Sequence, residues 1–249
     1  MNGIRIFLQE LGRYVLLMKE AFKRPQNNRV FLGRMVFEMK ALGIDSIIIV
    51  LIISVFVGAA IVIQLLLNIK GPVYPSWVYG FAARKAIILE LAPTIISLIL
   101  AGKCASRIAS ELGTQRITEQ IDALEVMGVN TASYLILPKI VACLIFFPLL
   151  MIMSIFSALM GGLIGALPLG SLTFFDYVQG VRLEFGTGEI IYAVVKAVIN
   201  ALIISSIACY RGYTLKGGSV EVGQESTKAI VQSSIAIMVF NILITSLFN

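Results

Sequence analysis

Two ionisable side chains interrupt long apolar stretches of this chain. Glu90 lies in the stretch 78–102, and Lys196 lies in the stretch 190–210. If these stretches cross a bilayer, a charge near its centre costs on the order of 2.5 to 3.5 kcal/mol, so such residues usually face water, a substrate or an opposite charge. Glu90 and Lys196 could therefore pair with each other, or Lys196 could attract a phosphate group. Alternatively, each side chain extends to the membrane surface.

A second polar group lies between two apolar runs, in the charged segment 111–138. On a helix drawn through it, one face is apolar and carries Ile117, Ile121, Leu124 and Gly128. Another face is an acidic stripe of Glu119, Asp122 and Glu125. The stripe could contact a partner with basic residues, or the helix could simply be solvated, and the periodicity leaves both open.

Other sites are not supported by the sequence. The chain has no histidine, and Cys104, Cys143 and Cys209 have no CxxC spacing, so we expect neither a metal site nor a disulfide. The acids are scattered, and we expect no catalytic residues and no enzyme activity. The stretch 212–219 has the glycine spacing of a phosphate-binding loop, but Gly218 stands where the lysine belongs. We therefore expect no nucleotide site in this stretch.

The composition predicts which solvent surrounds these residues. Hydrophobic residues make up 58% of the 249 residues, charged residues 14%, and the mean hydropathy is +0.93. A soluble domain could not bury that much apolar side chain, so we expect an all-α integral membrane protein. The net charge of +6 comes from basic residues spread along the chain, which argues against a nucleic-acid partner.

Five runs are long enough to span a bilayer, which needs roughly 20 residues. We place them near residues 47–67, 78–102, 140–163, 190–210 and 229–248. Pro93 should kink the second. The prediction divides the chain into an N-terminal part, 1–43, and a membrane-spanning part, 44–249, with a loop at 103–139 that carries the charged segment.

The distribution of Lys and Arg predicts the orientation. Fifteen of these residues fall on one side if the N-terminus is cytoplasmic, namely Arg5, Arg13, Lys19, Lys23, Arg24, Arg29, Arg34, Lys40, Lys103, Arg107, Arg116, Lys139, Arg211, Lys216 and Lys228. The other side has only Lys70, Arg84, Lys85 and Arg182. The N-terminus is therefore predicted inside and the C-terminus outside.

The first 40 residues lack a continuous apolar core typical of a cleavable signal peptide. Their periodicity instead predicts an amphipathic helix lying in the cytoplasmic membrane interface, with one apolar face of Ile4, Phe7, Leu8, Leu11, Tyr14, Val15 and Met18. The alternative is a helix packed against a soluble partner.

Small and amide side chains in the spans have two interpretations each. Gln64 ends the first apolar run and could border a cavity or make an interhelical hydrogen bond. Ser157, Gly161 and Gly165 form a row that permits close backbone approach. That row could form a dimer contact or pack within one subunit.

The sequence also resembles a known family along nearly its whole length. The matching stretches are Gly58 and Gln64, LELAP at 89–93, AGKCASRIASELGT from Ala101, ELGTQRITEQIDALEVMGV from Glu111, YLILP at 134–138, and RGYTLKGGSVEVGQESTKAIV at 211–231. They are similar to the MlaE family, also called YrbE or Mce-associated permeases. These are subunits of ABC transporters that move phospholipids or other lipids in the bacterial inner membrane.

The resemblance implies partners and a site. It implies a homodimer, a separate ABC ATPase subunit that binds ATP and Mg²⁺ so that this chain binds no cofactor, an extracytoplasmic MCE-domain protein and a phospholipid substrate. A lipid cavity is then expected at Gln64, Leu67, Glu90, Leu91 and Lys196. Leu89 stands where many relatives have Arg, so that part of the family's motif is missing.

The charged segment is also similar to the EAA loop by which many ABC importer permeases engage their ATPase, although Asp122 replaces the leading Glu. The resemblance implies a cytoplasmic coupling helix. Its expected contact residues are Arg116, Glu119, Gln120, Asp122, Glu125 and Gly128. A secondary transporter that relays ions or protons through Glu90 and Lys196 is the alternative function, although no inverted pair of broken spans is visible.

Overall fold

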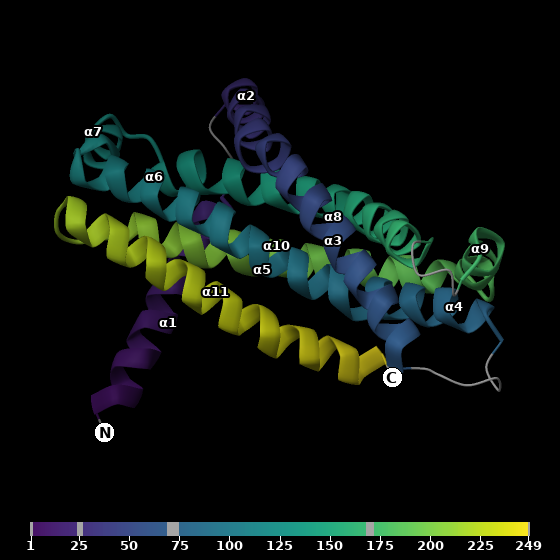
Figure 1. Ribbon diagram of the computed structural model, residues 1–249. Helices are drawn as coiled ribbons and strands as arrows, with labels where there is room; N and C mark the ends of the chain where they lie inside the picture. The colour runs from purple at the N-terminus through teal and green to yellow at the C-terminus, as the bar shows by residue number, and fades with distance from the viewer. Residues whose placement is uncertain (1, 24–26, 69–74, 168–171, 249) are drawn as a thin grey trace. The chain divides into compact units, whose positions relative to one another are not determined.

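The structure is a computed structural model that describes residues 2–23, 27–68, 75–167 and 172–248 (Figure 1). Side chains are described from residue 8 to residue 247 within these ranges. Arg24 and Lys70, which entered the charge count, lie outside the described residues, and so do the side chains of Ile4 and Phe7.

Five helices in the described ranges are long and apolar enough to cross a membrane, which confirms the predicted all-α fold. They are Asn28–Asn68, Trp77–Ile117, Ala132–Ala166, Thr187–Tyr213 and Ser219–Leu247. Each contains one predicted span. A helix bonds most of its backbone polar groups within itself, which suits a lipid environment.

Several of these long helices are composite. The first consists of α2 (Asn28–Glu38), the π-helical segment η1 (Met39–Ile44) and α3 (Asp45–Asn68). The second consists of α4 (Trp77–Ala86), η2 (Ile87–Ile96), α5 (Ser97–Leu100), η3 (Ala101–Ala105) and α6 (Ser106–Ile117). The third consists of η4 (Ala132–Ile136) and α8 (Leu137–Ala166), and the last two are α10 (Thr187–Tyr213) and α11 (Ser219–Phe248). The shorter helices are α1 (Asn2–Ala21), α7 (Gln120–Val126) and α9 (Phe174–Arg182).

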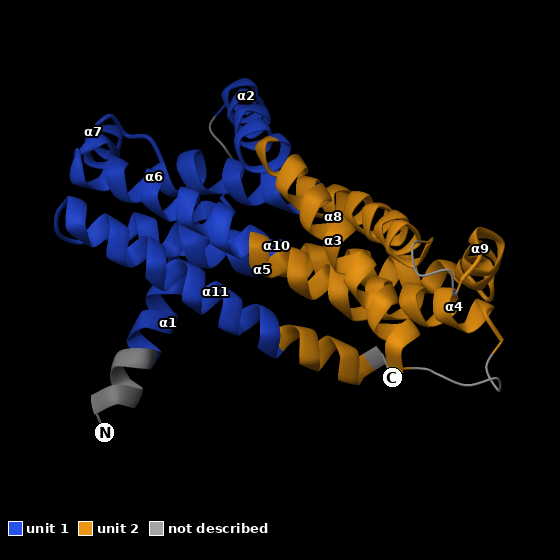
Figure 2. Cartoon of the chain, viewed as in Figure 1, with its two compact units in different colours: residues 1–44, 100–145, 201–239 blue, residues 45–99, 146–200, 240–249 orange. Residues whose placement is uncertain are grey.

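The chain forms two compact units, each drawn from three stretches of sequence (Figure 2). Unit 1 contains residues 1–44, 100–145 and 201–239. Unit 2 contains residues 45–99, 146–200 and 240–249. The charged segment therefore belongs to unit 1, whereas Glu90 and Lys196 both belong to unit 2.

In unit 1, the helix predicted near the N-terminus is α1, and only part of its apolar surface is covered. Tyr14 is half-buried and donates a hydrogen bond to the Ser206 hydroxyl at 2.7 Å, and Met18 is buried. Leu11 and Val15 from the predicted apolar face are exposed. Such a helix can pack on its own subunit and still present apolar side chains to a membrane surface.

In unit 2, α3 and α8 cross at very short distance, and glycine makes this possible. A Cβ placed on Gly58 would lie 1.8 Å from the Ala158 carbonyl oxygen, and one on Gly161 would lie 2.1 Å from the Val55 carbonyl oxygen. A Cβ on Gly165 would lie 2.9 Å from the Ala59 Cβ. The small-residue row of the third span is therefore used for packing within the subunit.

Helix α9 in unit 2 packs on α4 through a second pair of glycines, Gly80 and Gly180. Tyr177 of α9 is buried beside them, and its hydroxyl donates to the Leu159 carbonyl oxygen at 2.9 Å. Burial raises the pKa of Tyr177 to about 12, because the phenolate would lose its hydration. Tyr177 is therefore a neutral hydrogen-bond donor at physiological pH.

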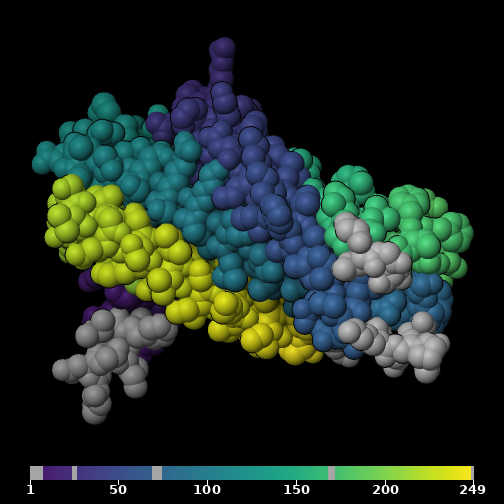
Figure 3. Space-filling view, viewed as in Figure 1, coloured from purple at the N-terminus to yellow at the C-terminus, as the bar shows by residue number. Residues whose placement is uncertain are grey.

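Helices α3 and α11 are the least covered of the five long helices. Figure 3 shows α11, in yellow, on the face that is viewed. Its exposed apolar side chains are Val220, Val231, Ile235, Met238, Val239, Phe240, Ile242, Leu243 and Leu247. Such surfaces suit contact with lipid chains or with another apolar protein surface.

Candidate functional site

A π-helical segment and a proline change the backbone hydrogen bonding around Glu90. In an α-helix the amide of residue 93 would bond the carbonyl oxygen of Leu89, but Pro93 has no N–H. The chain responds with the ten-residue π-helical segment η2 instead of a simple kink. Such segments are rare and often mark functional sites. The Leu89 carbonyl oxygen therefore lacks its α-helical donor, and it accepts a hydrogen bond from a side chain.

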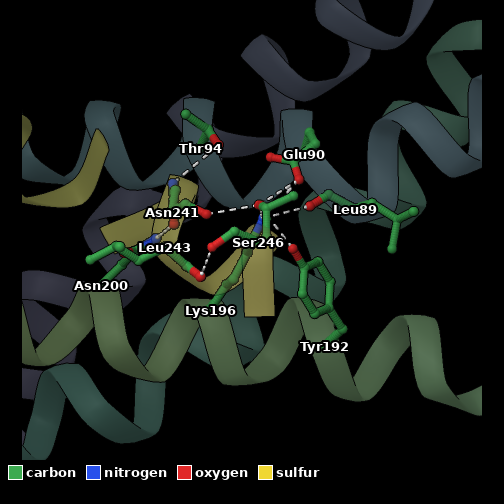
Figure 4. A network of polar contacts seen from close by, with 10 residues as sticks. Leu89, Glu90, Thr94, Tyr192, Lys196, Asn200, Asn241, Leu243 and Ser246 are labelled. Atoms are coloured by element: carbon green, nitrogen blue, oxygen red, sulfur yellow. Dashed lines mark hydrogen bonds and ion pairs between the residues drawn. The ribbon is translucent and has the colours of Figure 1, made fainter. Parts of the chain in front are cut away.

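Lys196 of α10 supplies the missing donor. Its ammonium group donates to the Leu89 carbonyl oxygen at 3.0 Å, to Glu90 Oε1 at 3.0 Å and to Thr245 Oγ1 at 2.9 Å (Figure 4). An ammonium has three protons, so all three are used. The side chain is fully buried and does not extend to the surface. The Lys196 ammonium nitrogen also lies 4.5 Å from the centroid of the Tyr192 ring, which adds a cation–π contact.

Further polar groups on α10 and α11 extend this network within unit 2. Thr245 accepts from the Tyr192 hydroxyl at 3.0 Å and lies 2.9 Å from Glu90 Oε1. Asn241 donates to the Thr94 hydroxyl at 3.1 Å, and Asn200 donates to Asn241 Oδ1 at 3.3 Å. Most members are satisfied by partners from another helix, which holds the buried charge in one geometry.

Glu90 differs from Lys196 because it also faces a pocket. Its side chain is 46% exposed, and the pocket beside it has a volume of about 410 Å³. The lining combines carboxylate, hydroxyl and apolar groups from Leu89, Glu90, Gly188, Glu189, Ile191, Tyr192 and Thr245. Glu90 and Glu189 are both paired with buried cations, so the pocket offers hydrogen-bond acceptors with little net charge.

Arg84 fixes the rim of this pocket. It is completely buried, donates to the Val181 and Leu183 carbonyl oxygens at 3.1 and 2.9 Å, and pairs with Glu189 at 3.2 Å. The rings of Phe81 and Phe185 lie 5.3 and 5.4 Å from its guanidinium carbon. The sequence analysis counted Arg84 only as a charge on the outer side and did not foresee this role.

The remaining predicted cavity residues do not join the pocket. Gln64 and Leu67 are exposed on α3 and do not line it. Leu91 lines a separate small void with Ser54 and Ala158. In unit 2 the structure brings Glu90 and Lys196 together, and lipid contact of all five residues stays a prediction.

The charged segment in unit 1 differs from the single helix drawn through residues 116–128. Helix α6 ends at Ile117, Glu119 takes a left-handed conformation with φ 58°, and α7 starts at Gln120. Arg116 spans this corner and pairs with Asp122 at 2.7 Å. Ile121 anchors α7 by burying its side chain completely.

This corner changes which side chains are available to a partner. Glu125 accepts hydrogen bonds from the hydroxyls of Thr131 and Tyr213, both at 3.1 Å, so it helps to hold α7. Glu119 and Gln120 are exposed, and so is Gly128, which closes α7 with φ 77°. Two apolar neighbours that the sequence analysis did not single out, Val126 and Met127, are 89% and 68% exposed.

Comparisons with known proteins agree with this architecture. The profile of the family described as permease MlaE matches residues 35–247. A probable ABC transporter permease protein of Rickettsia bellii is 30% identical over 247 residues, which cover 96% of this chain and 92% of the relative. The chain belongs to the MlaE permease family.

Other relatives of this permease broaden the comparison. A probable ABC transporter permease protein of Synechocystis is 28% identical over 246 residues, covering 98% of the permease and 92% of the relative. The chloroplastic protein trigalactosyldiacylglycerol 1 of Arabidopsis thaliana is 29% identical over 211 residues, covering 85% and 60% of the two chains. Family membership indicates a multi-pass transport subunit of ABC type.

The network of this permease contains a sequence signal that the analysis did not use. Three polar pairs are each spaced by four residues, which places both members on one helix face. These pairs are Glu90 and Thr94, Lys196 and Asn200, and Asn241 and Thr245. Polar residues at helical spacing inside apolar runs could have indicated that the three helices meet there.

Proposed function

We propose that this chain is the membrane-spanning subunit of an ABC transporter that moves phospholipids or related lipids, driven by a separate ATPase. The supporting observation is the buried Lys196–Glu90 pair, whose half-exposed carboxylate faces a pocket with both polar and apolar lining. A pocket of about 410 Å³ is within the range that holds a small ligand or a polar group of a larger one. Amphiphiles need both kinds of surface.

The chemistry of the pocket favours particular lipid headgroups. Lys196 has no proton left for a phosphate, whereas Glu90 has one carboxylate oxygen without a hydrogen bond among the described residues. Hydroxyl or ammonium groups of a headgroup would suit such acceptors. The name of the Arabidopsis relative includes that of a galactolipid, trigalactosyldiacylglycerol, whose headgroup has many hydroxyl groups.

The apolar exposed faces of α3 and α11 support a second copy of this chain and surrounding lipid as neighbours. We further propose the bacterial inner membrane, a cytoplasmic N-terminus and a periplasmic C-terminus, with an MCE-domain protein outside. Fourteen of the fifteen basic residues that the sequence analysis assigned to the cytoplasm, all except Arg24 outside the described residues, belong to unit 1, which also contains α7. This distribution supports the orientation.

The ATPase is proposed to dock on the end of α7. The names of the bacterial relatives refer to ABC transporters, and this chain has no phosphate-binding lysine in its glycine-rich stretch. ATP and Mg²⁺ would then bind to the partner. Exposed Val126 and Met127 offer an apolar contact at the C-terminal end of α7, and Glu119 offers a charge at its N-terminal end.

We expect Met127→Asp and Val126→Asp each to lower the affinity for the ATPase by about tenfold, because a charge would replace an apolar side chain that the bound ATPase covers. Glu119→Lys should have a smaller effect, since exposed charges contribute little. Co-purification and titration of the ATPase measure this. Val220→Asp changes an equally apolar, exposed valine elsewhere in unit 1 and is the control. Unchanged affinity in both α7 variants would contradict the docking site.

A photoreactive residue at Ile191, which lines the pocket, should crosslink to lipid in the assembled complex. The same residue at Ile145, exposed in unit 1, reports general contact with the membrane. We expect the headgroups captured from Ile191 to differ from the bulk composition captured from Ile145, as mass spectrometry can determine. Identical lipid profiles, or crosslinks to protein alone, would argue against a substrate site.

The alternative is a secondary transporter that uses Glu90 and Lys196 as an ion relay. It predicts lipid-independent uptake driven by a proton or ion gradient in vesicles that contain only this chain. The ABC proposal predicts that movement of lipid requires the ATPase and ATP. Vesicle assays with and without ATP therefore separate the two.

A further inference from the structure

A second buried lysine joins three helices in unit 1. Lys139, the third residue of α8, is 1% exposed. Its ammonium contacts Glu38 Oε1 and lies 2.8 Å from Glu111 Oε1. Glu38 ends α2 and Glu111 lies in α6, so these three residues, which we call the Lys139 cluster, connect the first, second and third long helices.

Stability alone does not account for burying these charges. Desolvating an ammonium and a carboxylate costs several kcal/mol, and well-packed apolar residues are often as stable as a buried ion pair. Glu38 is almost fully buried, and its Oε2 has no hydrogen-bond partner among the described groups. What a buried ion pair provides instead is a fixed geometry, because neither charge can leave the other without a large penalty.

The cluster lies on both chain paths that lead away from α7. Glu111 is on α6, which runs directly into the corner at Glu119, and Lys139 is on α8, which the chain reaches after α7 through η4. Arg116 and Glu125 fix α7 to these same surroundings through Asp122, Thr131 and Tyr213. A displacement of α7 is therefore expected to shift the residues of the Lys139 cluster through α6, through η4, or through both.

Glu38 is the member of the Lys139 cluster that would pass such a shift to the first long helix. It is followed at once by η1, a π-helical segment whose Ala41, Leu42 and Gly43 are buried. Runs of π-helix are rare, and they are enriched at functional sites. A shift of Glu38 would thus act on η1, which leads directly into α3.

We propose that Lys139 is a positioning residue that transmits movement of α7 to the first long helix through Glu38. The proposal rests on the proposed docking of an ATPase to α7. In this proposal the Lys139 cluster contacts neither nucleotide nor lipid. Its effect is expected in the ratio of lipid moved to ATP hydrolysed, because a coupling free energy links two sites without being part of either.

The test uses the complex of this chain with its ATPase in lipid vesicles. Lys139→Met leaves two carboxylates without their buried partner and is expected to lower folded yield. The triple variant Glu38→Gln, Glu111→Leu, Lys139→Met removes all three charges of the Lys139 cluster and should recover folding. We expect this variant to bind the ATPase normally while lipid moved per ATP falls about tenfold. Glu111→Gln, which keeps the Lys139–Glu38 pair, should show a smaller fall of the same kind.

Three readouts keep the outcomes distinct. Failure of the wild-type chain to bind the ATPase or to move lipid would reject the proposed function itself. With a working wild type, an unchanged ratio of lipid to ATP in folded Glu111→Gln and triple variants would reject the positioning role of Lys139. Equal losses of ATPase binding and transport would also reject it, because they indicate general damage to unit 1.

Discussion

Replacing Lys196 with methionine should abolish lipid transport and destabilise the protein by about 3 kcal/mol. Methionine keeps the length of the side chain but has no donor. The Leu89 carbonyl oxygen, Glu90 and Thr245 would each lose a hydrogen bond inside unit 2. The Leu89 carbonyl oxygen has no α-helical donor to return to, because Pro93 lacks an N–H.

Two variants separate the charge of Lys196 from its hydrogen bonds. Glu90→Gln keeps an acceptor for Lys196 but leaves its fully buried ammonium without an opposite charge, so it should also destabilise the protein, by about 3 kcal/mol. It should in addition reduce transport, since Glu90 faces the pocket. Lys196→Arg keeps the charge, but the planar guanidinium cannot reproduce three converging bonds.

Thermal unfolding in detergent and ATP-driven lipid movement in vesicles measure these effects. Lys196→Met with wild-type unfolding temperature and transport would contradict both the structural and the functional role of the network. Normal stability with lost transport would indicate that Lys196 contacts lipid in another state of the transporter.

The sequence could predict the fold because hydropathy and charge asymmetry are local properties. The span that contains Glu90 and the span that contains Lys196 both follow from about 20 consecutive residues. Pairing of these two residues was one of the alternatives, since a buried charge needs a partner. Which neighbours complete the pair could not be derived, because Thr245 lies 49 residues from Lys196 in sequence.

Errors arose where long-range contacts decide the structure. Lys139 looked like a charge at a span edge, yet its burial depends on Glu38, 101 residues away. The break in the charged segment occurs at Glu119, and a residue of this type rarely adopts a positive φ. The corner forms because Arg116 and Asp122 pair across it and Ile121 is buried beyond it. None of these contacts is visible in the periodicity.

The crossing of α3 and α8 leads to the other large expected effect. Gly161→Val and Gly58→Val should each prevent accumulation of folded protein, with a cost of about 3 kcal/mol or more. The new Cβ would meet a backbone carbonyl oxygen at 2.1 or 1.8 Å, and a backbone cannot move aside as a flexible side chain can. The two long helices would have to separate along the whole crossing, which would also loosen the packing of Val62, Ala166 and Tyr177 beside it.

Matched glycines make the result specific. Gly223→Ala in α11 and Gly102→Ala in the second long helix place a Cβ where no atom lies within 4 Å. Alanine is the better helix former by about 1 kcal/mol, so these controls should be neutral or stabilising. Gly58→Ala, by contrast, should already lower the unfolding temperature, because the clash involves Cβ itself. Yield of monodisperse protein and unfolding temperature decide the matter, and normal values for Gly58→Ala would mean that α3 and α8 do not approach so closely.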